Sequence, residues 1–377
     1  MRDGQVNLDD SRFVDGLDPE QISKFSIDPG DLLMTRYNGS RGLVGISGLV
    51  PVHSGTFIHP DKLIRIVLDT SRILPAFANY QLSSPAVRSH LEPRIRTTAG
   101  QSGIAGADVR SIPLAVPSLD EQRRIVDVLE DHLSRLDAAN ADLVAARRRS
   151  AAMVMSSMAH AVAAASRSSP MTSVGAEAEF VEYGTSAKCG DGAGASSPVP
   201  VLRMGNLKNG EIAWDSLKYL EASHPEFPKL ILAPGDLLFN RTNSAELVGK
   251  SAVYEFGPRA SFASYLIRVR FRESVDPRWA NIAINSPQGR AYVGSVASQQ
   301  VGQANVNGTK LKAFPLPLPP VEHQRQLIAV HDAVQASARR LAASASLSVH
   351  RSMALRRALL AAAFSGRLTG DREVAGV

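Results

Sequence analysis

The stretch Pro29–Leu33 (PGDLL) recurs further along the chain as Pro234–Leu238. Each copy leads to an arginine and then an asparagine, at Arg36 and Asn38 in the first copy and at Arg241 and Asn243 in the second. Both copies next reach Leu-Val-Gly, at residues 43–45 and 247–249. Matches that keep their order in this way indicate an internal duplication, which is the first thing to establish about a fold.

Beyond these loops the two copies match without gaps at a constant offset of 202 residues. Ala78-Asn79 corresponds to Ala280-Asn281, and Gly100-Gln101 corresponds to Gly302-Gln303. The pair Gln122-Arg123 likewise corresponds to Gln324-Arg325. A repeat this long is far above the period of solenoid repeats, so each copy is predicted to be a globular domain followed by a helix.

The two copies are unequal at their beginnings. Met1 falls inside the repeat, and Gly4 aligns with Gly210 of the second copy. Residues 172–205 therefore have no counterpart in the first copy. We expect either that the true start lies upstream or that the gene is truncated, which leaves the first domain incomplete at its N-terminus.

Each domain is predicted to end at a long helix. Ser118 and Glu121 form a capping box at the start of the first helix, and Pro319-Pro320 precedes the second. Apolar residues then follow the 3-4 spacing of a coiled-coil seam, with Asn140 at a position where a polar residue can fix register. The members of this seam in the first helix are Val126, Leu129, Leu133, Leu136, Asn140 and Leu143.

Neither helix can bury its stripe alone, so the two are expected to pack as an antiparallel pair. The alternative is that each stripe packs against its own domain. A helix of this length spans roughly 65–70 Å at ~1.5 Å per residue, and such a pair would hold two similar domains apart about a pseudo-twofold axis. Duplex DNA read at two half-sites has matching geometry. The fold class is thus α+β, with two mixed α/β domains and two long spacer helices.

Composition limits the class of protein without identifying its ligand. The 377 residues carry a formal net charge of +6 and include one cysteine, which excludes an internal disulfide. Residues 1–115 and 116–169 are each electrically neutral, so bulk charge does not itself argue for DNA. No long apolar run or signal peptide is visible, which predicts a cytoplasmic protein without a membrane partner.

Motifs for catalysis are missing from the sequence. There is no phosphate-binding Gly-x-x-x-x-Gly-Lys-Ser/Thr loop, no Asn-Pro-Pro-Tyr-like motif for amino methylation, and no compact acidic cluster of a nuclease. Cys189 has no Cys or His at ligand spacing. The chain is therefore predicted not to be an enzyme and to have no metal site.

Polar residues at equivalent loops are the candidates for contact with DNA. Arginine suits guanine or phosphate, and asparagine and glutamine suit the edge of adenine. The alternative is that these side chains stabilise their own loops. The candidates are Arg36, Tyr37, Asn38, Arg41 and Gln101 in the first domain, and Tyr183, Ser186, Lys188, Arg241, Asn243, Ser244, Gln299, Gln300, Gln303 and Asn305 in the second.

The chain resembles the specificity subunits of type I restriction-modification systems over nearly its whole length. The resemblance rests on the two PGDLL stretches before the Arg-x-Asn loops and on the region-closing motifs Ile112–Arg123 (IPLAVPSLDEQR) and Phe314–Arg325 (FPLPLPPVEHQR). The terminal Ala363–Leu368 (AFSGRL) is similar as well.

This resemblance implies a domain order along the chain. Residues 1–115 would form the first target-recognition domain, 116–168 the first spacer helix, 169–314 the second recognition domain and 315–377 the second spacer helix. Each domain would read half of a bipartite sequence in double-stranded DNA. The helices would dock two methyltransferase subunits, to which restriction/translocase subunits are added. The chain itself would hold no cofactor, because S-adenosylmethionine, ATP and Mg²⁺ belong to those partners.

Three other interpretations remain open at this point. The chain departs from the family pattern at its start, so it could be a truncated or orphan subunit with one functional half-site reader. It could also be a coiled-coil scaffold without a role in DNA binding, although the polar loops at equivalent positions argue against this. An enzyme that acts alone is the weakest alternative because its motifs are missing.

Overall fold

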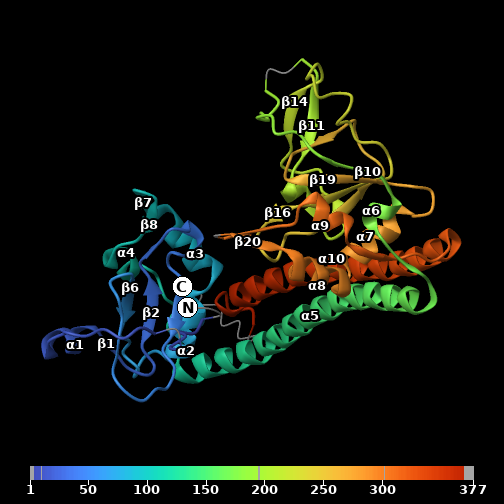
Figure 1. Cartoon of the computed structure of the whole chain (residues 1–377). Helices are drawn as coiled ribbons and strands as arrows, with labels where there is room; N and C mark the ends of the chain where they lie inside the picture. Colours follow the sequence, from blue (N-terminus) through green and yellow to red (C-terminus); the bar gives the residue numbers. More distant parts are fainter. Residues whose placement is uncertain (1–3, 10, 194–195, 301, 369–377) are drawn as a thin grey trace. The chain divides into compact units, whose positions relative to one another are not determined.

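The computed structural model describes residues 4–9, 11–193, 196–300 and 302–368 (Figure 1). Contacts divide the chain into two units, Met1–Val144 with Ala345–Val377 and Ala145–Ser344. The division falls within two long helices, α5 (Leu119–Ser168) and α10 (Val321–Ala363). Each unit therefore contains one domain together with one end of each helix.

The domain of the first unit is built on two small antiparallel sheets. The PGDLL stretch supplies β2 (Leu32–Thr35), which lies between β4 (Ser47–Leu49) and β6 (Leu63–Ile66). The side chains of Leu32 and Met34 are fully buried against the helices that follow. The second sheet contains β3 (Tyr37–Asn38), β8 (Gln101–Gly103) and β7 (Arg96–Thr98). The other elements are α1 (Pro19–Phe25), β1 (Ser26–Ile27), η1 (Arg41–Leu43), β5 (Phe57–Ile58), α2 (Pro75–Leu82), α3 (Pro85–Leu91), η2 (Glu92–Arg94) and α4 (Gly106–Arg110).

The domain of the second unit contains the same two sheets in a larger frame. Its central strands are β17 (Ser251–Tyr254), β15 (Asp236–Asn240) and β19 (Leu266–Phe271), with β10 (Ala178–Tyr183) added beside β19. Its second sheet contains β16 (Thr242–Asn243), β21 (Gln303–Asn305) and β20 (Ser298–Gln300). The helices are α6 (Val174–Glu177), α7 (Pro277–Asn285), α8 (Pro287–Val296) and α9 (Gly308–Lys312), with the 3-10 helix η3 (Met204–Asn206). The remaining strands are β9 (Met171–Ser173), β11 (Pro198–Leu202), β12 (Leu207–Lys208), β13 (Glu211–Ile212), β14 (Lys218–Glu221), β18 (Ser261–Phe262) and β22 (Pro315–Pro317).

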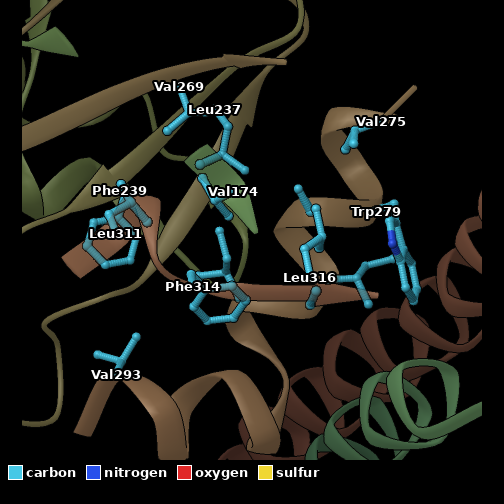
Figure 2. Packing of buried hydrophobic residues seen from close by; sticks show 14 of the residues in the cluster. Val174, Leu237, Phe239, Val269, Val275, Trp279, Val293, Leu311, Phe314 and Leu316 are labelled. Carbon is cyan, nitrogen blue, oxygen red and sulfur yellow. The ribbon is translucent and has the colours of Figure 1, made fainter. Parts of the chain in front are cut away.

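Figure 2 shows part of the core of this domain, in which the side chain of Trp279 is fully buried. Its indole Nε1 donates a hydrogen bond to the carbonyl oxygen of Pro317 at 2.9 Å, so the one polar atom of the ring is satisfied. Leu237 and Phe239 of β15 point into the same core from the sheet. The core therefore ties the sheet to the segment that leads into α10.

The two domains share their element order, and the predicted mixed α/β fold is confirmed. β2, β4 and β6 correspond to β15, β17 and β19, and the second sheets correspond strand for strand. Each domain contains a matched pair of short helices, α2 and α3 in the first and α7 and α8 in the second, broken before Pro85 and Pro287. The proline cannot continue the first helix of each pair, so a second helix begins there. The side chains of Ser84 and Ser286 cap the start of this second helix.

The aspartate of PGDLL explains why that stretch occurs twice. Asp31 accepts a hydrogen bond from the backbone N–H of Asp28 at 2.8 Å and pairs with Arg65 Nε at 2.6 Å. In the second domain Asp236 accepts from the backbone N–H of Ala233 at 2.8 Å, and Arg268 occupies the place of Arg65 opposite the strand. The Asp236 carboxylate is fully buried. A buried carboxylate is stable only when it is paired and hydrogen-bonded, and both conditions are met here.

Another matched contact joins Gly4, and its counterpart Gly210, to the helices of its own domain. Asn79 donates to the carbonyl oxygen of Gly4 at 2.7 Å, and Asn281 donates to that of Gly210 at 2.9 Å. The alignment of Gly4 with Gly210 inferred from the sequence is therefore confirmed.

One buried amide fastens each long helix to its own domain. The side-chain oxygen of Gln122 accepts from the backbone N–H of Leu74 at 2.8 Å, and its nitrogen donates to the carbonyls of Arg72 and Pro117 at 2.8 and 2.9 Å. Gln324 makes the same three bonds to residues exactly one repeat later, namely Asp276 at 2.8 Å, Ser274 at 2.9 Å and Pro319 at 2.8 Å. Both amides are fully buried.

The long helices pack against each other in antiparallel fashion within each unit. In the first unit, Leu129 and Leu133 of α5 share a core with Leu360 near the end of α10. Asn140 donates to the Ser352 hydroxyl at 2.9 Å, as expected for a polar residue that fixes register. In the second unit, the C-terminal half of α5 packs against the N-terminal half of α10. Ser157 of α5 and His331 of α10 are hydrogen-bonded there at 2.9 Å. The predicted antiparallel pair is therefore confirmed. No helix of the described residues is long and apolar enough to cross a membrane.

The buried glutamines give a matched pair of stability predictions. Gln122→Ala and Gln324→Ala should each lower the free energy of unfolding by about 2–3 kcal/mol, because each leaves one buried N–H and two carbonyls without their partner. Denaturant unfolding followed by circular dichroism measures this change. The control is Gln326→Ala, an exposed glutamine on α10, which should leave the midpoint unchanged. Equal midpoints for all three variants would refute the anchoring role.

Burial of His331 between the helices predicts a dependence of stability on pH. Burial lowers the pKa of His331 below its ordinary value of 6.5, and Arg278 and Arg339 add to this effect while Asp332 opposes it. Below pH 6.5 the unfolded chain thus binds more protons at this residue than the folded chain does, so the stability falls as pH falls towards the folded pKa. The repeat supplies the control His331→Leu, because Leu129 occupies the equivalent buried position. The wild-type chain should lose more stability than this variant between about pH 8 and about pH 5; parallel pH profiles would contradict the prediction.

Candidate nucleic-acid interface

The second sheet of the first domain brings two predicted stretches together. Tyr37 and Asn38 of β3 pair with Gly103 and Ser102 of β8, so the Arg36–Asn38 loop lies beside the hairpin that carries Gln101. The hairpin turns through Ala99 and Gly100, whose φ angles are 49° and 79°. Positive φ at both central residues matches the right-handed twist of the strands and makes a tight two-residue turn. Gln101 is exposed directly after this turn.

Arg36 and Tyr37 form a stacked pair at the end of β2. The guanidinium group of Arg36 lies 4.6 Å from the centre of the Tyr37 ring, a geometry in which a cation is attracted to the ring face. The Nε atom of Arg36 is buried and has no hydrogen-bond partner within the described structure. The absent side chain of Gly103 makes room for the ring, because a Cβ atom there would overlap Tyr37. Asn38 lies next to this pair, and its side-chain oxygen accepts from the backbone N–H of Ser40 at 2.8 Å.

Arg41 occupies a different environment from the other candidates of the first domain. Its Nε contacts the Glu92 carboxylate at 2.8 Å, and its two terminal nitrogens donate to the carbonyls of Ile95 and Glu92 at 3.1 and 2.7 Å. The hydrogen bond from Arg41 is the largest cause that lowers the pKa of Glu92. Every nitrogen of this guanidinium group thus contacts the end of the α3–η2 segment, and Arg41 holds its loop in place.

The second domain arranges its candidates on the matching sheet. Thr242 and Asn243 of β16 pair with Asn305 and Ala304 of β21, and Asn305 donates to the Thr242 hydroxyl at 2.6 Å. Gln303 is exposed at the start of β21. The Asn243 side-chain oxygen accepts from the backbone N–H of Ser244 at 2.8 Å, which shapes the loop after β16. The backbones of Gln299 and Gln300 lie in β20, opposite Ala304 and Gln303, and their side chains lie outside the described structure.

Arg241 is stacked on a tyrosine, like Arg36, but the ring comes from another part of the chain. Its guanidinium lies 4.9 Å from the centre of the ring of Tyr183, at the end of β10. The Tyr183 hydroxyl accepts from the backbone N–H of Gly308 at 2.7 Å, which fixes the ring while 42% of the residue stays exposed. The Nε atom of Arg241 is also buried without a partner within the described structure. The position that corresponds to Tyr37 is Thr242, so the arginine–tyrosine stack is rebuilt rather than copied.

Ser186 and Lys188 lie apart from the sheet, in an open cleft of about 290 Å³. The cleft lies next to Arg241, whose backbone N–H donates to the carbonyl of Tyr265 and whose side chain reaches the carbonyl of Ser264 at 3.4 Å. Both of these residues line the cleft together with Arg203 and Lys218. No local sequence pattern shows that β11, β14 and β18 converge, so the predicted contacts do not include Arg203, Lys218 or Tyr265.

The described residues contain no group of three or more His, Cys, Asp and Glu side chains that could hold a metal ion. Cys189 lies in the wall of the cleft, and burial raises the pKa of its thiol. The polar groups of the two domains are thus arginine, tyrosine, amide and hydroxyl side chains on an ordered sheet, which are suited to hydrogen bonding and stacking.

Comparison with known proteins places this arrangement in a family. The chain is 25% identical over 395 residues to the EcoKI specificity subunit of Escherichia coli K12, and 24% identical over 395 residues to the StySPI specificity subunit of Salmonella potsdam. Both are type I restriction enzyme subunits, and each alignment covers 98% of this chain and 81% of the relative. This chain is thus similar over nearly its whole length to type I restriction enzyme specificity subunits.

Solved structures agree with this family at the level of the fold. A chain from a structure of the type I R-M system superposes with a TM-score of 0.71 at 19% identity, and covers 91% of this chain and 83% of its own length. The HsdS subunit of Thermoanaerobacter tengcongensis gives a TM-score of 0.53 at 18% identity, with coverages of 91% and 82%. No protein-family model matches the sequence.

Proposed function

We propose that this chain is the sequence-specific DNA-binding subunit of a type I restriction-modification complex, and that it carries out no catalytic step itself. The observation that carries the proposal is the recurrence, in both domains, of an arginine stacked on a tyrosine beside an asparagine at the start of a three-stranded sheet. A coiled-coil scaffold without a nucleic-acid role would have no need of the same polar surface in each domain.

The chemistry of these side chains fits the edges of base pairs. Arginine can bond the O6 and N7 atoms of guanine together, and asparagine or glutamine can bond the N6 and N7 atoms of adenine. Stacking on a ring orients the guanidinium plane and reduces the rotamer freedom lost on binding. We propose Arg36, Asn38 and Gln101 as readers in the first domain and Arg241, Asn243 and Gln303 in the second. The supporting contacts that we propose for DNA are Tyr37, Tyr183, Ser186, Lys188, Ser244, Gln299, Gln300 and Asn305.

The working arrangement follows the domain order inferred from the sequence. Residues 1–115 and 169–314 would recognise one half-site each, and the helical segments 116–168 and 315–377 would bind two methyltransferase subunits. Restriction/translocase subunits would complete the complex in the cytoplasm. S-adenosylmethionine, ATP and Mg²⁺ would be bound by those partners.

Reconstitution tests the function directly. The purified chain together with the methyltransferase subunits encoded beside it should methylate one bipartite sequence, identified by methylome sequencing of a host that expresses both. The methyltransferase subunits alone should methylate no defined site. Methyl transfer by this chain alone would reject a non-catalytic role, and unchanged methylation without the chain would reject the specificity role.

A pair of arginine variants tests the division of labour between the domains. Arg241→Ala should relax the base preference at one half-site at a cost of about 1–3 kcal/mol and leave the other half-site unchanged. Arg36→Ala should do the same at the opposite half-site. Competition binding with duplexes that carry single substitutions at each position measures both effects. Equal losses at both half-sites for either variant would contradict the assignment of one domain to each.

A further inference from the structure

The cleft beside Arg241 is lined by cations that form no ion pair with another described residue. Lys188, Arg203 and Lys218 converge on it from three segments of the chain. The ion pairs of the described part of the second unit use other cations, among them Lys208, Lys229 and Arg268. Three positive side chains that line one open cleft without a carboxylate create a positive local potential, which favours the binding of an anion.

The other groups of the cleft are suited to a phosphate. Ser186, Ser264 and Tyr265 add hydroxyl groups to the same wall, and the lining residues of the described structure include no Asp or Glu. Charged donors and hydroxyls converging on one space are the usual partners of phosphate oxygens. The cleft is open rather than enclosed, so it can admit a group that remains attached to a polymer.

The position of the cleft identifies the phosphate. Thr185 at its wall accepts from the backbone N–H of Ser264 at 2.7 Å, and the next residue, Tyr265, accepts from the backbone N–H of Arg241 at 3.0 Å. The cleft is therefore rigidly connected to the stacked arginine that we assign to base reading. We propose that the cleft formed by Lys188, Arg203 and Lys218 binds a backbone phosphate of the duplex and so sets the register of the second domain on its half-site. This inference rests on the proposed function.

Salt dependence of binding tests the cleft. The test uses the full chain in complex with its methyltransferase subunits. Two duplexes are compared: one carries the sequence that this complex methylates, and the other carries the same bases in scrambled order. The triple variant Lys188→Gln/Arg203→Gln/Lys218→Gln should weaken binding to both duplexes by a similar factor, roughly three- to ten-fold. It should also lower the slope of log K against log salt by about 1. The matched control is Lys208→Gln. Because Lys208 is already paired with Asp215 at 2.8 Å, this substitution should leave the slope unchanged.

A second measurement needs no change of sequence. Cys189 is the one cysteine of the chain, and its side chain lies in the wall of the cleft. Target duplex at saturation should slow alkylation of this thiol by iodoacetamide. The rates with and without duplex are compared at one alkaline pH, because burial raises the pKa of the thiol and only its thiolate form reacts. An alkylation rate unaffected by bound duplex would overturn the inference.

The outcomes separate this inference from the proposed function. A wild-type complex that fails to distinguish target from scrambled duplex would reject the proposed function. A complex that distinguishes them, but whose triple variant keeps the wild-type slope, would reject the cleft alone. Loss of binding to the target without loss to the scrambled duplex would assign the cleft to base reading instead. Calorimetric binding of inorganic phosphate that the triple variant abolishes, with an unchanged DNA slope, would make it a small-anion site and overturn the assignment.

Discussion

The amide of Gln122, together with its repeat Gln324, is the constraint on which the rest of the structure depends. Each amide bonds three backbone groups that belong to two different segments, the first turn of the long helix and the loop before the domain's own helices. Because both amides are fully buried, water cannot replace these bonds. The start of each helix is thereby fixed relative to its own domain. The polar sheet of that domain consequently has a defined position relative to the helix.

The contacts that build the frame are repeated between the domains, whereas those that face solvent are not. Asp31 and Asp236, Asn79 and Asn281, and Gln122 and Gln324 all bond backbone groups, whose positions depend on the fold and little on neighbouring side chains. At the second sheet, by contrast, Tyr37 is replaced by Thr242 and the ring is supplied by Tyr183. A frame held by backbone-directed bonds leaves its exposed residues free to change, as the proposed recognition of two different half-sites would require.

Local signals predicted the frame well because its elements are defined by neighbouring residues. The capping pattern at Ser118, the seam through Leu129 and Leu133, and the PGDLL turns each act within a few positions of the chain. The interface needed contacts that sequence spacing does not show. The sequence predicts that Arg41 contacts DNA. In the structure, all three of its side-chain nitrogens instead donate to Glu92 and Ile95. Tyr183 is placed over Arg241 through the register of β10 on β19, which no periodicity shows.

Net charge gave little guidance to the interface for a related reason. Residues 1–115 are electrically neutral, yet Arg36 is held over Tyr37 with its neighbours arranged for hydrogen bonding. In the second domain the cations of the cleft come from β14 and from the segments around Lys188 and Arg203, and they matter because no carboxylate shares the lining described. Charge acts over about 10 Å at moderate ionic strength, so a few converging cations determine the local potential regardless of the total. Residues 172–205 therefore supply both the ring for Arg241 and two of the three cations of the cleft beside it.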